Sequence, residues 1–404
     1  MRRAACAVAL ALTTSLATSL VGGSDVAAEP VEEPFSAVVH DVVRGDLVMA
    51  GNSNLVSAGG HVPAAAAAAD VDGDATPLCT GRLFVPAACG ENSSSATLDV
   101  PFGAHILAAR LYVNTSLTWA TGAVRVRLDG PAEGYTYTDL AAATPGVPKV
   151  RESAGSASVA AVPMRQAVWD VSEYVRAAGP GTYTVADIMF ERAGAYLPYA
   201  SWTIVAAYEL DPSVDLAALS TEQQARFARR AITWQDGFAT VSTGSVEIQV
   251  DGFDVPAGVP LFAKTFHLAA HSRQRGPDSL LFAGQPLGNN VSPGNAPAPP
   301  GVIIGSDPAC NSTTDILNDS ICLLGQPVAT KVPGAADFVA STDGSTPSSG
   351  SGVDFDVTRV PDRYFVAGAT SATLAVHASG RAPIAVSVLA ASVDLPAPAP
   401  SVAP

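Results

Sequence analysis

Residues 202–208 read Trp-Thr-Ile-Val-Ala-Ala-Tyr, with an aromatic residue at each end and three β-branched residues between them. An apolar run of this length and composition is typical of a β-strand. Similar apolar or alternating segments recur along the chain. They occupy residues 96–100, 106–113, 123–128, 182–190, 245–250, 261–268, 353–357, 373–377 and 384–393. The sequence therefore predicts strands over most of its length.

The segments between these strands are rich in residues that end strands, since the chain has 35 Gly and 31 Pro. Helical patterns are few. Ser220 and Gln223 form a capping box at the start of a helix predicted over 220–230, and a shorter helical turn is predicted over 170–178. We therefore expect an all-β fold with two antiparallel β-sandwich (jelly-roll-like) domains and one short linking helix.

The capped helix lies near the middle of the chain and divides it into two halves. We expect a first sandwich over residues 37–212, a helical linker over 213–230 and a second sandwich over 231–395. Residues 285–352 are rich in Pro, Gly, Ser and Asn, which predicts a long loop within the second sandwich. Residues 396–404 form a Pro-rich tail.

The first 28 residues are typical of a secretory signal peptide. Arg2 and Arg3 precede an apolar stretch, and small residues lead to a cleavage site before Glu29. A membrane anchor needs about 20 predominantly apolar residues, and Thr, Ser and the Gly22-Gly23 pair interrupt this segment. We therefore expect a secreted, extracellular protein, associated with the cell surface or free, with no transmembrane segment after cleavage.

Four cysteines follow the leader in two pairs that are close in sequence, Cys79 with Cys89 and Cys310 with Cys322. Thiols tend to oxidise outside the cytoplasm, so structural disulfides are expected. Three pairings are open to four cysteines, and 79–89 with 310–322 is the simplest. A zinc site is the competing interpretation, but it favours closer cysteines or neighbouring histidines.

Charge limits the classes of partner. The chain has 22 Lys and Arg against 37 Asp and Glu, which gives a net charge of −15. A nucleic-acid partner is therefore not expected, because binding phosphates requires a positive surface. Hydrophobic residues make up 48% of the chain and charged residues 15%, a composition that excludes disorder for most of its length.

Six short motifs in a fixed order carry a family resemblance. They are residues 45–55 (GDLVMAGNSNL), 70–74 (DVDGD), 92–98 (NSSSATL), 108–112 (AARLY), 199–209 (YASWTIVAAYE) and 236–238 (DGF). Together they resemble the N-terminal β-sandwich region of large bacterial (actinobacterial-type) cell-surface proteins that continue into repeated fimbrial, isopeptide-type modules. The resemblance implies an exported, surface-associated all-β protein and no particular activity. This chain ends where the repeats would begin, so we expect a free secreted module or one held by other subunits.

The clearest chemical motif is Asp70-x-Asp72-Gly73-Asp74. Alternating carboxylates with a glycine turn suit a cation that prefers oxygen ligands, so a structural calcium ion is the candidate cofactor. An EF-hand is excluded because its twelfth loop position would be Gly81, which has no side-chain oxygen. The alternative is an acidic turn that keeps the loop soluble.

Three other groups of polar residues are candidate sites. His267 and His271 lie four residues apart without an acidic residue between them, and we expect polar side chains on the exposed side of a strand rather than a metal pair. Asp354 and Asp356 are expected on a solvated strand face. Lys264 falls on the apolar side of its strand, where burial would lower the pKa of its amine. Lys264 is thus a candidate for an isopeptide cross-link to an Asn or Asp side chain, with a stem that reaches water as the alternative.

No motif of a serine hydrolase or a zinc protease occurs, so we expect no enzyme and no catalytic residues. The preferred function is a structural or adhesive module that binds a glycan, a cell-wall polymer or a surface protein through loops. The alternative is a calcium-dependent carbohydrate-binding protein or a hydrolase on a jelly-roll scaffold. The four tryptophans would support sugar stacking if exposed on one face, but we expect them in the core. They are Trp119, Trp169, Trp202 and Trp234.

Overall fold

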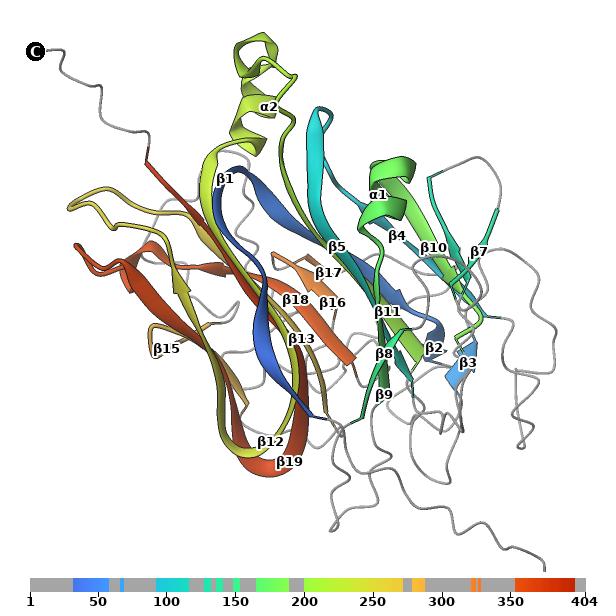
Figure 1. Cartoon of the computed structure of the whole chain (residues 1–404). Coiled ribbons are helices and arrows are strands. Elements are labelled where there is room, and N and C mark those ends of the chain that lie inside the picture. Colours follow the sequence, from blue (N-terminus) through green and yellow to red (C-terminus); the bar gives the residue numbers. More distant parts are fainter. Residues whose placement is uncertain are drawn as a thin grey trace, which may run out of the picture.

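A computed structural model describes most of the predicted strands. The described residues are 32–57, 66–68, 92–115, 127–131, 136–140, 148–152, 165–188, 200–271, 278–287, 321–324, 326–327 and 353–396. Strands dominate these ranges, and the predicted all-β class is confirmed (Figure 1). Within these ranges, neither helix has the length and apolar character needed to cross a bilayer.

The elements are as follows in chain order. The strands are β1 (Glu33–Ser53), β2 (Leu55–Ser57), β3 (Ala66–Ala68), β4 (Ser93–Leu98), β5 (Ala104–Thr115), β6 (Arg127–Asp129), β7 (Thr138–Asp139), β8 (Lys149–Glu152), β9 (Arg165–Asp170), β10 (Gly181–Ala186), β11 (Ala200–Leu210), β12 (Arg229–Asp251), β13 (Ala263–His271), β14 (Ser279–Phe282), β15 (Gln285–Pro286), β16 (Ile321–Leu323), β17 (Gln326–Pro327), β18 (Val353–Val360) and β19 (Ser371–Asp394). The helices are α1 (Ser172–Ala178) and α2 (Thr221–Arg226), with single 3₁₀ turns at Leu216–Ala218 and Asp362–Tyr364.

One large sheet organises the molecule. Its strand order is β17-β16-β18-β13-β19-β12-β1-β11-β5-β9-β8, with β14 and β15 joined to it through β19. The pairs are antiparallel except β16 with β18, which is parallel, so the sheet is mixed. A second sheet has the order β4-β10-β6-β7, and β2 pairs with β3.

Strand β1 connects the two halves of the large sheet. Its first half pairs with β12 as far as Arg44, and its second half pairs with β11 from Gly45 onward. Figure 1 shows β1 running along β12, bending sharply and continuing along β11. At the bend the backbones approach so closely that a Cβ at position 45 would overlap the carbonyl oxygen of Tyr208. Glycine is required there because it has no side chain.

Three apolar clusters fill the spaces between layers. The central cluster contains residues from both halves of the large sheet, including Tyr112 of β5 and Phe355 of β18, so the sheet folds back on itself. A second cluster lies between β5, β9, β11 and the β4-β10-β6-β7 sheet. A third lies on the far face of β12, β13 and β19. Central strands of the large sheet such as β11 are therefore covered on both faces, as their apolar runs require.

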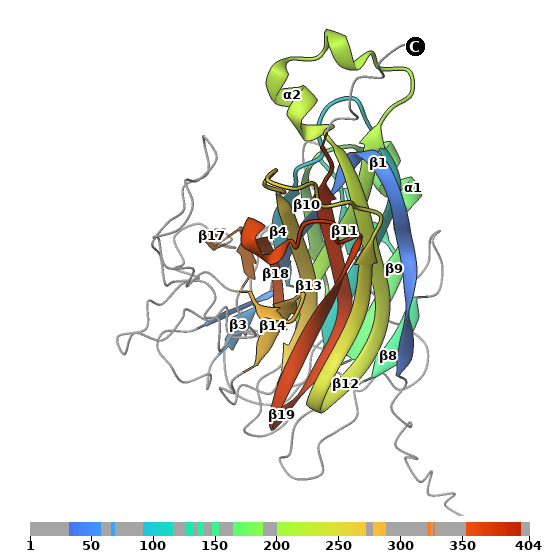
Figure 2. The same cartoon turned by 90° about the vertical axis from the view of Figure 1, so that its left-hand side faces the viewer.

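The predicted helices are confirmed with shorter bounds. Ser220 caps α2 and forms the predicted capping box with Gln223, and α1 ends at Gly179. None of the residues of α2 is buried, and Figure 2 shows this helix projecting beyond the ends of the strands. The helix thus occupies the connection between β11 and β12 without contributing to a core.

Two sequence-based expectations differ from the structure. The segment predicted as a loop over 285–352 contains β16, which pairs with the interior strand β18. The segments 373–377 and 384–393 belong to one strand, β19, rather than two. Its pairing with β12 is interrupted between Ser379 and Ile384, where Gly380 has a φ of 93°. The glycine that interrupts the apolar pattern between the two segments therefore lies at an irregularity within one strand.

Candidate functional site

Asp46 is the centre of a buried ion cluster at the bend of β1. Its Oδ2 lies 2.8 Å from the Nζ of Lys264 and 3.6 Å from Nη1 of Arg230. The second carboxylate of the cluster, Asp394, lies with its Oδ1 2.6 Å from Nε of Arg230. Ser392 also donates a hydrogen bond to Asp46 at 2.7 Å. Two cations and two carboxylates from β1, β12, β13 and β19 therefore meet inside the scaffold.

The electrostatics of the two carboxylates differ. Burial alone would raise the pKa of Asp46, but the positive charges of Lys264 and Arg230 outweigh it and hold this pKa below its usual value. Burial also raises the pKa of Asp394, and there Arg230 does not compensate fully. Asp46 is thus the more firmly ionised member of the pair.

Lys264 lies where the sequence places it. It shares a sheet face with Phe266 and Leu268, which belong to the central apolar cluster, and its side chain is 14% exposed. Its Nζ also donates a hydrogen bond to the carbonyl of Leu47 at 3.2 Å. Among the described residues, Asp46 is the carboxyl group in contact with Lys264 and is therefore the candidate acceptor by which the isopeptide hypothesis can be tested.

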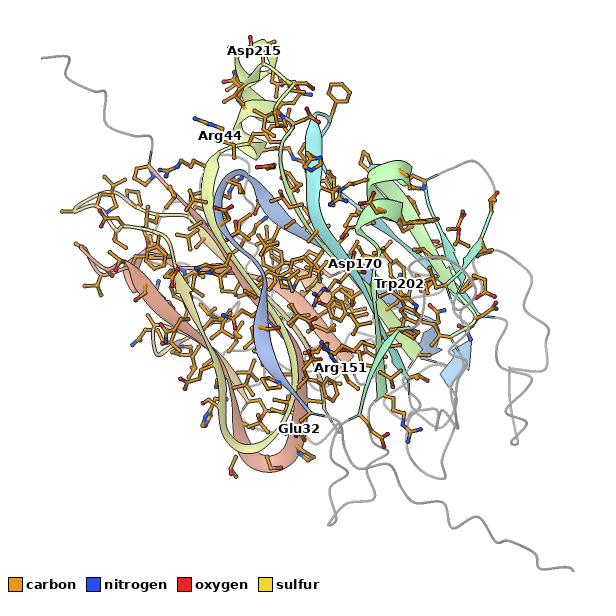
Figure 3. All side chains as sticks on the ribbon, viewed as in Figure 1. Glu32, Arg44, Arg151, Asp170, Trp202 and Asp215 are labelled. Atoms are coloured by element: carbon orange, nitrogen blue, oxygen red, sulfur yellow. The ribbon has the colours of Figure 1, made fainter. Side chains whose placement is uncertain are left out.

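A second ion cluster surrounds Asp236 of β12. Arg151 of β8 donates from Nη1 to Asp236 at 2.7 Å and from Nε to Glu33 at 2.8 Å, and Arg110 of β5 also contacts Asp236. Figure 3 shows Arg151 between the two halves of the large sheet. Burial and the charge of Asp236 raise the pKa of the neighbouring Tyr112 well above its usual value. This cluster joins the two halves of the sheet across the central core.

The tryptophans in the described ranges belong to the core, as expected. Trp169, Trp202 and Trp234 are at most 1% exposed, while Trp119 lies outside the described residues. The indole of Trp202 donates to Ser94 at 2.8 Å, and Ser94 in turn donates to Asn54. Sugar stacking on these three side chains is therefore excluded in the folded chain.

The third polar cluster joins His267 of β13 to Asp354 and Asp356 of β18. The Nε2 of His267 lies 3.2 Å from Asp354 Oδ1 and 3.6 Å from Asp356 Oδ2. All three side chains are completely buried. The expectation that His267 and both aspartates occupy an exposed strand face was wrong, because they are buried on the face of β13 and β18 that also carries residues of the third apolar cluster. The side chain of His271 lies outside the described residues.

Several predicted site residues cannot be compared with the structure. Asp70, Asp72 and Asp74, the candidate calcium ligands, lie outside the described residues. So do Cys79, Cys89 and Cys310. Cys322 is buried in β16. The pairing of Cys310 with Cys322 stays a prediction.

No protein-family model matches the chain, and no curated protein is similar to it at a significant level. The resemblance to bacterial cell-surface proteins therefore stays a prediction from the sequence motifs.

Proposed function

We propose that the chain is a secreted or cell-surface-associated module with a structural or adhesive role. It binds a glycan, a cell-wall polymer or a surface protein through the loops that connect its strands, and it carries out no catalysis. The predicted organisation as two jelly-roll-like sandwiches is part of this proposal. Export is supported by the leader-like first 28 residues and by the sequence-close cysteine pairs.

The observation that carries this proposal is the location of the charged clusters. Asp46 with Lys264, and Asp236 with Arg151, connect strands that are distant in sequence and lie inside the layers. Their ionic groups hold the scaffold together and are withdrawn from the surface. A β scaffold fixed in this way is a suitable support for binding loops, which carry function in many such domains. The net charge of −15 favours a neutral or basic partner.

A binding array tests the proposal. The untagged chain without its leader is applied to immobilised glycans, cell-wall polymers and surface proteins, with calcium in one arm and a chelator in the other. We expect retention by one class of partner in both arms. Binding to none of these classes, or cleavage of a bound polysaccharide, would overturn the proposal.

The calcium arm also tests the alternative function, a calcium-dependent carbohydrate-binding protein. Binding that requires calcium and disappears in a variant with Asp70, Asp72 and Asp74 changed to asparagine would favour this alternative. The same variant serves as the control for binding that does not need the ion. Unchanged binding by the variant would show that the acidic motif is not part of the binding site.

A further inference from the structure

His267, Asp354 and Asp356 form a converging set of ligand atoms that the proposed function does not use. One nitrogen and two carboxylate oxygens lie within 4.8 Å of one another. All three side chains are completely buried. Clusters of exposed acids are common on protein surfaces, whereas buried charges in proteins are paired or coordinate metal ions, so a buried imidazole facing two buried carboxylates is a candidate metal site.

The sheet register builds this set. His267 pairs directly with Asp356 across β13 and β18, and Asp354 lies two residues away on the same face of β18. The backbone N–H of Cys322 on β16 donates to Oδ1 of Asp356 at 2.6 Å, so that Oδ2 of the same carboxylate faces His267. Three neighbouring strands therefore fix the directions of the ligand atoms. Hydrogen bonds of this kind orient carboxylate ligands in metal sites.

The polar contacts of the imidazole ring involve the same set of atoms. Its Nε2 faces both carboxylates, whereas its Nδ1 is buried and has no hydrogen-bond partner among the described residues. All polar contacts of the ring thus converge on one point. In the described structure, the ring is therefore oriented by its contacts with these two carboxylates.

We propose that His267, Asp354 and Asp356 bind one divalent transition-metal ion, with zinc as the best-fitting ion. Zinc binds imidazole nitrogen and carboxylate oxygen at about 2.0–2.2 Å in a tetrahedral arrangement, which separates neighbouring ligand atoms by about 3.3–3.5 Å. The measured separations from Nε2 are 3.2 Å and 3.6 Å. The ion connects β13 to β18, and through the bond from Cys322 it also stabilises β16.

The ligand set distinguishes this ion from calcium. Calcium takes six to eight oxygen ligands at about 2.3–2.6 Å, whereas this set includes a nitrogen and is more compact. A divalent ion with two carboxylates and a neutral imidazole has no net charge, as a buried site requires. The site therefore differs from the acidic motif at residues 70–74 in its residues and in its preferred ion.

The competing explanation is a hydrogen-bonded triad without an ion, in which Nε2–H of His267 donates to the carboxylates. Metal content distinguishes the two. The untagged full chain without its leader is unfolded, refolded with zinc, with calcium or with a chelator, and dialysed before metal is counted by mass spectrometry. Refolding is needed because the site is closed in the folded chain. We expect about one zinc per chain, no retained calcium, and a higher melting temperature for the zinc-loaded sample.

Isosteric variants identify the ligands. Asp354→Asn and Asp356→Asn are expected to reduce retained zinc to background. The matched control is Asp251→Asn, because Asp251 lies 2.9 Å from His40 in an exposed histidine–aspartate pair, and this variant is expected to retain zinc like the wild type. Equal retention in all three variants would place the zinc elsewhere and overturn the proposal.

Wild-type measurements keep the test decisive if the asparagine variants do not fold. X-ray absorption at the zinc edge is expected to show one imidazole with oxygen ligands. Sulfur ligands would assign the zinc to cysteines and contradict the site. Folded wild-type protein that retains no zinc after refolding would establish the hydrogen-bonded triad instead. None of these outcomes depends on the adhesive function.

Discussion

At the scale of single residues, replacing Lys264 with methionine tests what the cluster around Asp46 contributes to stability. Methionine keeps most of the apolar stem and removes the charge 2.8 Å from Asp46. Because a buried carboxylate then loses its nearest cation, we expect the free energy of unfolding to fall by about 2–3 kcal/mol. Denaturation in urea measures this change.

Lys149→Met is the matched control. Lys149 also contacts a carboxylate, that of Glu33, but its side chain is 58% exposed. Exposed ion pairs contribute about 0–1 kcal/mol, so this variant should lie within about 1 kcal/mol of the wild type. Equal losses in the two variants would mean that burial does not decide the strength of the Asp46 cluster.

The cross-link hypothesis for Lys264 can be tested against a named acceptor. Although burial opposes it, the charges of Lys264 and Arg230 hold the pKa of Asp46 below its usual value. An ionised carboxylate is a poor acceptor for an amine, so we expect an ion pair rather than an amide. The intact mass of the unreduced chain should then show only the hydrogens lost to disulfides. Loss of one additional water molecule would establish the amide.

At the scale of elements, Gly45 determines whether β1 can pass from one half of the sheet to the other. A methyl group there would overlap the carbonyl oxygen of Tyr208 on β11. Since neither backbone can move without breaking ladder bonds, Gly45→Ala should lower the free energy of unfolding by about 2 kcal/mol or more. Gly244→Ala is the control, because an added methyl group at Gly244 meets no other atom and only the positive φ of this residue disfavours alanine. We expect this variant to lower the free energy of unfolding by about 1 kcal/mol. Similar losses would contradict this role for Gly45.

The strands that the sequence predicts are those with an apolar pattern of their own. The run at 202–208 lies within β11, whose residues are buried over nearly their whole length. The first half of β1 carries no such pattern, since residues such as His40 and Asp41 are exposed, and its position depends on pairing with β12. The first half of β12 follows α2 closely, and the helix predicted over 220–230 includes Arg229 and Arg230, which begin this strand. Long-range pairing of this kind is not visible in a local pattern.

The buried polar clusters also depend on long-range strand pairing, which a local sequence pattern does not show. The Asp-Phe-Asp sequence at 354–356 alternates as an exposed strand does, and only the folded structure shows that all three side chains are buried. His267 meets these aspartates because β13 pairs with β18, a contact between segments far apart in sequence. Lys264 was identified from the sequence alone because its own strand register places it on the apolar side. Its partner Asp46 comes from a strand that the pattern did not reveal.

At the scale of the whole molecule, the two carboxylates at the bend of β1 give opposite contributions to the pH dependence of stability. The pKa of Asp46 is lowered on folding, so its contribution is fully present above its unfolded pKa of about 3.9 and is lost as the pH falls through the folded value. The pKa of Asp394 is raised on folding, so acidification relieves a cost and the folded chain gains stability as the pH falls through this value. The net slope of wild-type stability below neutrality is the sum of such terms.

Asp46→Asn and Asp394→Asn separate these contributions, with each variant as the control for the other. Removing Asp46 eliminates a contribution that is lost below about pH 4, so the stability of Asp46→Asn should fall less than that of the wild type between about pH 6 and pH 2. Removing Asp394 eliminates a contribution to stability that increases as the pH falls. The stability of Asp394→Asn should therefore fall more steeply than that of the wild type over the same range. Urea denaturation at intervals of pH measures both curves against the wild type. Both carboxylates contact Arg230, so the two substitutions are not independent. If both curves shift in the same direction, the loss of either carboxylate disrupts the whole cluster. The conclusion that folding lowers the pKa of Asp46 and raises that of Asp394 would then be wrong.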